Sequence, residues 1–481
     1  MKGVALRFVA IAAAAVCIAA VAASAGAAST RHGVHTYATR GTIPLRTGMF
    51  DPFTMNGSQY ATAMTDTRKA GATYVRIEVP WSEIAPAAPP AESATDPTWY
   101  GYQWGWLDTK VEAAIANHLV PYLQLGVAPG WSLGTSSTPK VALLREFATA
   151  LATHYDGAHG VPAVHIYQVW NEPNLSLDLS PVKPATYRSM VNAVATAVKA
   201  VDNSNLIVAG ALDPFSNKTK QWHSEAPLIY MRSLLCISGG KHPHRTCKSQ
   251  IHFDIWAHHP YTFGGPFAKA KRPDDVSLGN LPEMRSLLTL GRRLHTIVSA
   301  KAPQFWVTEF AWGTSPPRTK AAPVALAARW TAESLYQMWR SGVTLATWFV
   351  IEDQPKPSPY ATGLYYHAKS LAHARAKPVR TAFRFPFVAY LGRGTVRVWG
   401  RTATSTKKLV TVHMRAGLRG HWRTVARVEP NRYGIFRATL RLAASKRDWL
   451  RASASGSGNS LAFSLTVPKP KRKYGPWGST G

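Results

Sequence analysis

Between Thr47 and Arg380 the sequence alternates short β-rich runs with amphipathic stretches of helical length. This alternation is typical of βα units, whose strands pair in parallel. Eight apolar runs can be counted: Thr47 to Phe50, Tyr74 to Val79, Val120 to Gly126, His165 to Trp170, Leu206 to Ala211, Phe253 to His258, Gln304 to Glu309 and Thr344 to Val350. Helix candidates with apolar residues at three- and four-residue intervals lie between them, for example Val141 to His154, Pro184 to Val201, Leu281 to Val298 and Val324 to Arg340. Eight such units predict an α/β fold, a closed (β/α)8 TIM barrel over residues 45–385, and not an open doubly wound sheet.

From about Pro386 the pattern changes to short runs in which apolar and polar residues alternate. Turns containing Gly or Asn separate these runs, as in half-buried antiparallel sheets. The runs are Thr395 to Arg401, Lys408 to Met414, Trp422 to Val428, Ile435 to Leu442, Trp449 to Ala454 and Leu461 to Val467. They predict a small C-terminal antiparallel β-sandwich over 386–468. The tail 469–481, rich in Lys, Arg and Gly, is predicted to be disordered.

The N-terminus has the order of a secretory signal peptide. Lys2 and Arg7 precede an apolar run to about Ala23, and small residues follow. A single membrane anchor is the alternative, but the run is only ~16 residues long where a spanning helix needs roughly 20. We therefore expect a signal peptide over 1–28, a linker over 29–44, and a secreted protein that is extracellular or cell-wall associated, without a membrane span after signal removal.

Two cysteines would remain in the mature chain. Cys236 and Cys247 bracket a basic loop that contains His242 and His244. A metal site is one interpretation, but this spacing fits no common zinc pattern. Because an exported chain meets an oxidising compartment, a disulfide is the preferred prediction.

The net charge of +31 is concentrated near the C-terminus. From Pro378 onward the sequence contains 21 Lys or Arg residues but only two acidic residues, Glu429 and Asp448. Such a surface is expected to attract an anionic cell-wall polymer, although solubility alone would explain it equally well. A nucleic-acid partner is not expected, because no recognised motif accompanies the charge and the chain is predicted to be exported.

Two glutamates close apolar runs in the same way. Glu172 follows the fourth run in the segment 169–174 (VWNEPN), and Glu309 ends the seventh run in 305–310 (FWVTEF). The tripeptide Asn-Glu-Pro is weak evidence alone, since it arises by chance. Side chains at the carboxyl ends of barrel strands converge on substrate, and strands four and seven face each other across the mouth. Glycosidic bond cleavage needs such a pair, with one carboxylic acid to protonate the leaving oxygen and one carboxylate to attack the anomeric carbon.

These separated motifs resemble clan A of the retaining glycosidases, which includes glycoside hydrolase families 5 and 39. The resemblance covers most of Thr47 to Arg380 and implies that Glu172 is the general acid/base and Glu309 the nucleophile. It further implies substrate-binding or positioning roles for Arg76, Asn171, His259, Tyr261 and Trp348, with Asn171 on the sugar 2-hydroxyl, Arg76 beside the nucleophile and Trp348 as a platform. The family 5 His near strand three has no counterpart in 124–129 (QLGVAP), and 80–84 (PWSEI) looks closer to family 39.

Simpler structural explanations exist for the helper residues. Arg76 could pair with Glu78 on the same strand face. His259, like its neighbour His258, could be a satisfied core histidine, and Trp348 could be core. Tryptophans in predicted βα loops are costly to expose without purpose, so an aromatic-lined cleft is expected, with these candidates: Trp81, Trp131 and Trp312.

The sequence thus predicts a secreted glycosidase that cleaves a polysaccharide or oligosaccharide by double displacement, with no cofactor and no metal. The same steps with a sugar acceptor would give transglycosylation. A non-catalytic polysaccharide-binding protein on a barrel scaffold is the alternative, but such a binder would not need both Glu172 and Glu309.

Overall fold

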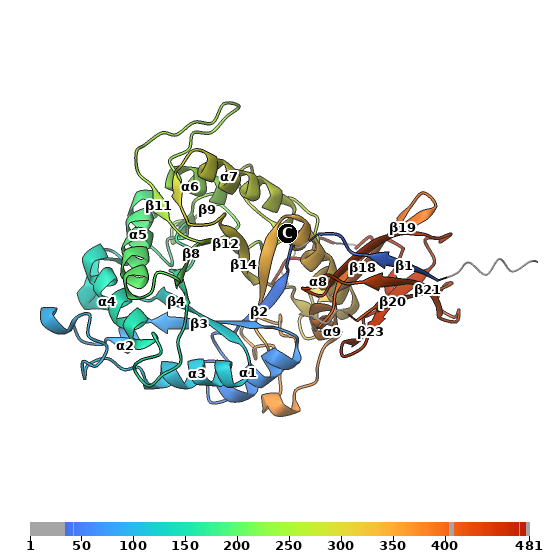
Figure 1. Cartoon of the computed structure of the whole chain (residues 1–481), viewed down its shortest axis with the longest axis horizontal. Helices are drawn as coiled ribbons and strands as arrows, with labels where there is room; N and C mark the ends of the chain where they lie inside the picture. The colour runs from blue at the N-terminus through green and yellow to red at the C-terminus, as the bar shows by residue number, and fades with distance from the viewer. Residues whose placement is uncertain (1–33, 42, 404–407, 471, 478–481) are drawn as a thin grey trace, which may run out of the picture. The chain divides into compact units, whose positions relative to one another are not determined.

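Eight parallel strands close into a barrel in the computed structural model, which describes residues 34–41, 43–403, 408–470 and 472–477 (Figure 1). The strands are β2 (Arg46–Phe50), β3 (Tyr74–Pro80), β4 (Val120–Gly126), β7 (Ile166–Val169), β8 (Leu206–Leu212), β12 (Ile255–His258), β14 (Gln304–Phe310) and β17 (Val343–Phe349). Each pairs with its successor along the chain, and β17 closes the barrel on β2. All eight predicted runs are barrel strands, which confirms the predicted fold class. The predicted signal peptide lies outside the described residues.

Helices surround the barrel and cover the outer faces of its strands (Figure 1). They are α1 (Tyr60–Lys69), α2 (Trp81–Ile84), α3 (Gly105–Ala116), α4 (Val141–His154), α5 (Pro184–Val201), α6 (Pro227–Leu234), α7 (Leu281–Arg293), α8 (Val324–Arg340) and α9 (Pro378–Arg384). In α5, Pro184 occupies the first turn, where its missing N–H costs nothing. Tyr187, Val191, Val194 and Val198 follow at helical spacing and are fully buried.

Helix α7 is shorter than the predicted stretch, which extended to Val298. It ends at Arg293, because His295 adopts a left-handed conformation with φ of 54°. The N–H of Thr296 then donates to the carbonyl of Gly291 at 3.0 Å, as in a Schellman cap. Ile297–Val298 form the short strand β13 instead, which pairs with β11 (Ile251–His252).

The loops also contain short strands and 3-10 turns. The strand pairs are β5 (Leu133–Thr135) with β6 (Thr138–Pro139), β9 (Asn217–Lys218) with β10 (His223–Ser224), and β15 (Thr314–Ser315) with β16 (Ala322–Pro323). The 3-10 turns are η1 (Ala91–Ser93), η2 (Gly130–Ser132), η3 (Leu278–Asn280) and η4 (Leu371–His373).

The barrel interior is filled by its own layer of side chains, separate from the larger core between strands and helices. The members of this inner cluster are Tyr122, Ile166, Val208, Ala211, Ile255, Ala257, Trp306 and Leu345. Because side chains alternate along a strand, the neighbours of Trp306, Phe305 and Val307, belong to the outer core. The filled interior leaves the carboxyl ends of the strands as the place where polar side chains can meet.

Two sheets follow the barrel and form the predicted C-terminal antiparallel sandwich. One contains β18 (Phe387–Gly392), β19 (Thr395–Arg401) and β22 (Ile435–Arg441). The other contains β20 (Val410–Arg415), β21 (Arg423–Glu429), β23 (Trp449–Ala454), β24 (Gly458–Asn459) and β25 (Phe463–Ser464), together with β1 (His35–Ala38). Alternate residues of β20, Val410, Val412 and Met414, are buried between the sheets, as the sequence pattern predicts.

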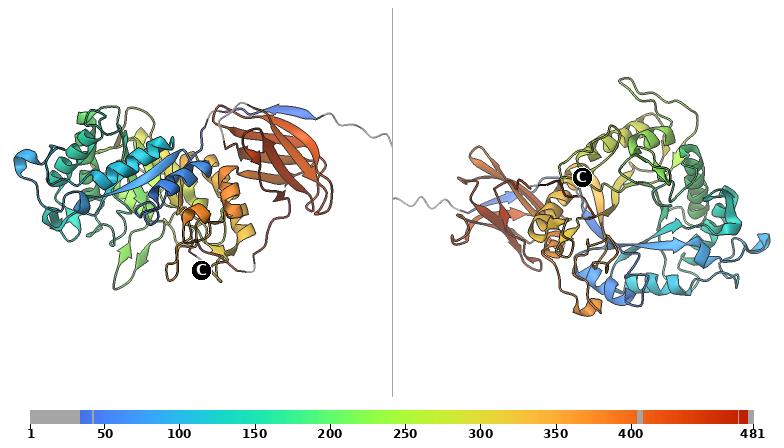
Figure 2. Two further views of the ribbon diagram at one scale, coloured as in Figure 1. Left: turned by 90° about the horizontal axis from the view of Figure 1, so that it is seen from below. Right: turned by 180° about the vertical axis from the view of Figure 1, so that it is seen from behind.

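The structure differs from the sequence expectation at both edges of the sandwich. Strand β18 was not among the predicted runs, and only Phe463–Ser464 of the predicted run 461–467 is a strand. Residues 35–38 of the expected linker form β1, which pairs in parallel with β21 and lies beside the red strands in Figure 2. A four-residue strand whose partner lies almost 400 residues away leaves no local periodicity to detect.

The sheets pack directly on the barrel helices. Helix α8 contacts β18 and α9. Arg401 is buried at the junction and donates to the hydroxyl of Thr47 in β2 at 3.2 Å. On α8, Arg329 donates to the carbonyl of Ser464 at 2.8 Å and lies over the ring of Phe463.

The predicted disulfide between Cys236 and Cys247 is confirmed, with 5.3 Å between the Cα atoms. It closes the basic loop between α6 and β11. Within the described part of the chain, no helix combines the length and apolar character needed to cross a bilayer.

Candidate active site

Glu309 reaches the barrel mouth through an irregularity in β14. The pairing register of β14 with β17 shifts between Val307 and Phe310. Both of these residues pack in the outer core, although they are three positions apart. The extra residue lets Thr308 and Glu309 both turn toward the mouth, which is how a bulge redirects a side chain.

Glu172 is presented by a strained turn directly after β7. Trp170 and Glu172 both have positive φ angles, 67° and 34°, which non-glycine residues rarely adopt. The N–H of Glu172 donates to the carbonyl of Ala211, at the end of the neighbouring β8, at 3.1 Å. The turn is thus held by an adjacent strand end, and backbone strain of this kind is typical of functional sites.

The two glutamates face each other closely. A carboxylate oxygen of Glu172, one of Glu309 and a ring nitrogen of His259 all lie within 4.8 Å of one another. The side chain of Glu172 is 15% exposed and that of Glu309 is 9% exposed. Burial raises the pKa of Glu172 well above its usual value, and the nearby Glu309 carboxylate raises this pKa further. A proton is therefore retained on Glu172 at pH values where an exposed glutamate would have lost it.

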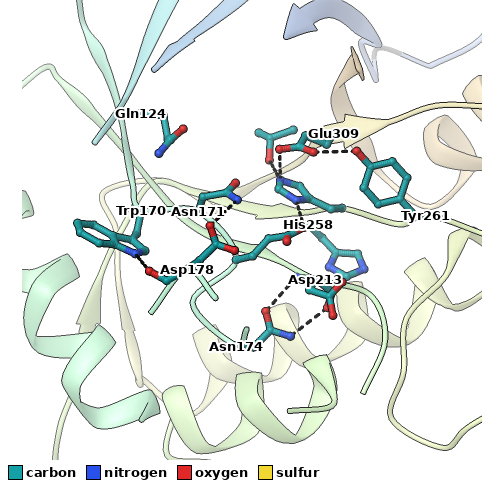
Figure 3. Close-up of polar contacts among 12 residues, drawn as sticks. Gln124, Trp170, Asn171, Asn174, Asp178, Asp213, His258, Tyr261 and Glu309 are labelled. Atoms are coloured by element: carbon teal, nitrogen blue, oxygen red, sulfur yellow. Dashed lines mark hydrogen bonds and ion pairs between the residues drawn. The ribbon is translucent and has the colours of Figure 1, made fainter. Parts of the chain in front are cut away.

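Glu309 is held at both oxygens. Arg76 on β3 donates to Oε1 at 2.8 Å. The hydroxyl of Tyr261 donates to Oε2 at 2.7 Å, as Figure 3 shows. No ion pair joins Arg76 to Glu78, so the simpler explanation of Arg76 does not apply. The other amino group of Arg76 donates to Asn171 Oδ1 at 2.7 Å. One fully buried guanidinium thus links the ends of strands β7 and β14.

His259 lies between the two glutamates. Its Nδ1 is 2.7 Å from Glu172 Oε1, and its Nε2 is 3.1 Å from the hydroxyl of Thr308. Burial lowers the pKa of His259 to about 4, so the ring is neutral near pH 7. The neighbouring His258 is the core histidine, with Nε2 2.8 Å from the carbonyl of Val276.

Trp348 is not at the site, contrary to the expectation of a sugar platform. Its side chain is fully buried, its Nε1 donates to the carbonyl of Thr362 at 2.8 Å, and it packs on Phe310 and Phe383. Side chains alternate between the two faces of a strand. Leu345 faces the barrel interior, so Trp348, three residues later, lies on the opposite face of β17. Its neighbour Phe349 points to the mouth instead.

A pocket of about 340 Å³ opens at the glutamates. Its lining residues are Phe50, Pro52, Phe53, Asn171, Glu172, Asp213, Tyr261, Glu309, Phe349, Tyr360 and Trp477. The lining is rich in aromatic rings, as expected, but the rings are different ones. Trp81 and Trp131 border a separate hollow, and Trp312 is buried against Trp330.

The matches to known proteins agree with this geometry. The model of the cellulase family (glycosyl hydrolase family 5) matches residues 37–274, a range that contains Arg76, Glu172 and Tyr261 and ends before Glu309. This chain is a glycosidase, similar to glycoside hydrolase families 5 and 39 of clan A. No curated protein matches this glycosidase significantly by sequence.

Solved structures share the fold of this glycosidase. A monomeric beta-xylosidase from Caulobacter crescentus CB15 has a TM-score of 0.51 at 16% identity, over 87% of this chain and 98% of the other. A family 39 beta-xylosidase from Caulobacter crescentus has a TM-score of 0.50 at 16% identity, with the same coverage. The family 39 enzyme from Xanthomonas axonopodis pv. citri has a TM-score of 0.49 at 14% identity, over 87% and 96% of the two chains.

Several polar residues of the glycosidase site were not predicted. Asp178 Oδ1 accepts from Asn171 Nδ2 at 3.3 Å, and burial raises the pKa of Asp178 to about 6. Gln124 Oε1 accepts from Arg76 at 2.9 Å, in the segment where the family 5 His was missing. Asp213 follows β8, and burial together with Glu172 raises its pKa. Only Asp213 directly follows a barrel strand, a position that it shares with many uninvolved residues, whereas Gln124 lies within β4 and Asp178 lies in the loop after β7.

Glu172, His259 and Glu309 are also the residues that could ligate a metal ion, among those the structure describes. Their other contacts fit this role poorly. Both oxygens of Glu309 already accept hydrogen bonds, from Arg76 and Tyr261. The fixed positive charge of Arg76 next to Glu309 would also repel a second cation.

Proposed function

We propose that this protein is a secreted retaining glycoside hydrolase that cleaves the O-glycosidic bonds of an oligosaccharide or polysaccharide by double displacement. In the first step the Glu309 carboxylate attacks the anomeric carbon. Glu172 donates its proton to the departing oxygen, and a covalent glycosyl-enzyme forms. In the second step Glu172 accepts a proton from water, which attacks the anomeric carbon and releases Glu309.

The short distance between the glutamates carries this proposal. One carboxylate oxygen of Glu172 lies within 4.8 Å of one oxygen of Glu309, whereas an inverting enzyme separates its carboxyl groups by about 6.5–9.5 Å to admit a water. Retaining enzymes keep the separation near about 5–5.5 Å. The arrangement therefore favours direct attack by Glu309.

The surroundings support different tasks for the two groups. Arg76 and Tyr261 hold Glu309 with charge-assisted hydrogen bonds and so orient it for attack. The raised pKa of Glu172 suits a general acid, and the neutral ring of His259 can share a hydrogen bond with either protonation state of Glu172. Asn171, fixed by Arg76 and Asp178, is proposed to bind the sugar 2-hydroxyl.

The test is hydrolysis of 4-nitrophenyl β-D-xyloside, β-D-glucoside and β-D-mannoside, with NMR of the first-formed sugar. The xyloside comes first because beta-xylosidases share the fold. We expect release of 4-nitrophenol from at least one substrate and a product that keeps the β configuration. An α product would refute the retaining mechanism. Binding of xylan, glucan or mannan without any hydrolysis would favour a non-catalytic binding protein instead.

We also propose that the basic C-terminal sheets attach the enzyme to an anionic cell-wall polymer. The guanidinium groups of Arg415 and Arg451 lie 4.8 Å and 4.4 Å from the Trp422 ring centre. Exposed Arg423 begins the adjacent strand β21. Repeated cations on one sheet attract polyanions through a salt-screened force.

A further inference from the structure

The C-terminal tail, expected to be disordered, returns to the barrel mouth. After β25 the chain leaves the sandwich and crosses back to the barrel, as Figure 2 shows. There the N–H of Gly264 donates to the carbonyl of Tyr474 at 2.9 Å, and the N–H of Gly313 donates to the carbonyl of Pro476 at 2.7 Å. Gly475 and Pro476 are buried, and the Tyr474 ring packs on Trp330 of α8. Within the tail, the segment Tyr474–Trp477 therefore makes specific contacts with the barrel.

The anchoring points belong to the loops that build the catalytic centre. Gly264 lies in the loop after β12, three residues beyond Tyr261. Gly313 lies in the loop after β14, four residues beyond Glu309. The tail is thus fixed by main-chain hydrogen bonds to the same two loops that supply the proposed nucleophile and its hydroxyl donor.

Trp477 forms part of the wall of the pocket that contains both glutamates. Its ring centre is 4.3 Å from that of Tyr261, 5.2 Å from that of Tyr360 and 5.7 Å from that of Phe349. Tyr261 in turn donates to Glu309 at 2.7 Å. A single aromatic ring therefore separates the Trp477 indole from the nucleophilic carboxylate.

We propose that Trp477 is a substrate-binding residue, and that the segment Tyr474–Trp477 closes one wall of the pocket for the sugar that becomes attached to Glu309. This inference rests on the proposed function. The ligand is a terminal pyranose, whose apolar CH face packs on the indole. Volume supports a small ligand, because about 340 Å³ lies at the lower end of the 300–1,000 Å³ range of small-molecule sites.

Trp477 takes the place of the aromatic ring that Trp348 was expected to present to the sugar. That tryptophan is turned into the core, so β17 offers only the smaller ring of Phe349 to the pocket. The tail supplies an indole from a distant part of the sequence.

The experiment compares two truncations of the full chain. One variant ends at Trp477 and keeps the segment, and the other ends at Lys473 and removes it. Trp477→Ala and Trp477→Phe separate the indole from the backbone contacts, and Tyr100→Ala is the aromatic control, since Tyr100 is 90% exposed. Each is assayed with 4-nitrophenyl β-D-xyloside, β-D-glucoside and β-D-mannoside, and each is checked by thermal unfolding.

For Trp477→Ala we expect KM to rise about fivefold to tenfold with kcat changed by less than about threefold, because a lost aromatic contact is worth this much. Trp477→Phe should recover part of the loss. The chain ending at Lys473 should lose more than the single substitution, whereas the chain ending at Trp477 and Tyr100→Ala should match the wild type. An unchanged KM in both Trp477→Ala and the Lys473 truncation would overturn the inference.

Trapping with 2-deoxy-2-fluoro-β-D-xylosyl, glucosyl and mannosyl fluorides separates this inference from the proposed function. If none of them labels Glu309 in the wild type, the double-displacement mechanism itself fails. If Glu309 is labelled in the wild type and at the same rate in the Lys473 truncation, the mechanism stands and the role of the tail is refuted. A slower labelling of the truncated chain, at the same thermal stability, supports the tail as part of the site.

Discussion

Arg76 Nη1 lies 2.8 Å from Glu309 Oε1, and the two side chains are 0% and 9% exposed. The residues are 233 positions apart in the sequence, so only closure of the barrel brings them together. A buried ion pair orients a carboxylate, but loss of one partner leaves an uncompensated buried charge. Arg76 therefore both positions the Glu309 carboxylate and stabilises the folded protein against the cost of burying its charge.

Arg76→Met should lower kcat/KM by about a hundredfold or more and reduce the free energy of unfolding by about 3–5 kcal/mol, because Glu309 is left unpaired. The double variant Arg76→Met with Glu309→Gln removes both charges and should regain much of the stability while remaining inactive. Urea unfolding of the single and double variants measures the coupling. Equal stability of Arg76→Met and the double variant would argue against a net contribution from the ion pair.

Mutation should separate the roles of the two glutamates. Glu309→Ala removes the nucleophile, so activity should fall by several orders of magnitude with every substrate. Glu172→Ala removes proton transfer, so activity should fall about 10²–10⁴-fold with poor leaving groups. With 2,4-dinitrophenyl glycosides, whose leaving group needs little protonation, the rate of glycosylation of Glu309 should fall far less. The glycosyl-enzyme intermediate should then accumulate.

Azide distinguishes the two variants, because it attacks without a general base. We expect azide to restore turnover in Glu172→Ala and to give a glycosyl azide of retained configuration. Rescue of Glu309→Ala with an inverted azide product would exchange the two assignments. Near-normal activity in both variants would place the catalytic pair elsewhere.

The raised pKa of Glu172 makes stability depend on pH in a definite direction. The folded protein holds the proton of Glu172 more tightly than the unfolded chain does. The stabilising contribution of this carboxyl is therefore complete below its unfolded pKa and is lost as pH rises toward its higher folded pKa. Glu172→Gln, which cannot ionise, should unfold about one to a few degrees above the wild type at pH 8 and show a smaller gain at pH 4.

Calorimetry of wild type and Glu172→Gln across this pH range checks the sign. In the wild type, kcat/KM should also decline as pH rises through the pKa of Glu172, because the acid must be protonated. A stability difference that does not change with pH would contradict the assignment of a proton to Glu172.

Removing the disulfide should affect stability and spare catalysis. It closes a short loop that joins residues 11 positions apart, so replacement of both Cys236 and Cys247 by Ser should cost at most about 3 kcal/mol. Neither cysteine lines the pocket. Thermal unfolding and kcat/KM of the double variant measure the two effects, with reduced wild type as the comparison. A large loss of kcat/KM at a temperature where the variant is folded would be unexpected.

Binding by the basic sheets should weaken steadily as salt rises. Arg415→Gln with Arg451→Gln removes two charges beside Trp422 and should lower retention on a polyanion such as heparin or wall teichoic acid, without changing kcat/KM on 4-nitrophenyl glycosides. The matched control is Arg145→Gln with Arg232→Gln on the barrel helices α4 and α6. Equal loss in both pairs would show that net charge alone governs retention.

The barrel and most of its site could be predicted because each signal was local. A buried strand reads as an apolar run, and the residue that follows it, such as Glu172, lies at the barrel mouth whatever the loops do. Six of the seven predicted site residues meet there for this reason. The prediction for Trp348 was wrong because a shift of one residue along the strand moves a side chain from the mouth to the core. The sequence 346–350 (ATWFV) is apolar on both faces and does not show which face is inside.

Trp477 could not be predicted from the sequence. Its segment is short, follows a run of basic residues and is rich in glycine, a composition typical of disordered segments. Its order depends on hydrogen bonds from Gly264 and Gly313, more than 160 residues away, and on the rings of Tyr261 and Tyr360. Asp178 and Gln124 escaped prediction for a related reason, since each matters only through Asn171 or Arg76.

The pairing of β1 with β21 has a consequence for the order in which the chain can assemble. Thr36 is paired with Arg427, so the first described strand has no partner until most of the polypeptide has been synthesised. The cost of closing so large a loop favours folding of the barrel first, with β1 added afterwards. Until then the edge of β21 is uncovered, and an unpaired edge is a template for aggregation. A recombinant version trimmed to the barrel start at residue 45 would expose this edge permanently and should aggregate where one that begins at residue 29 does not.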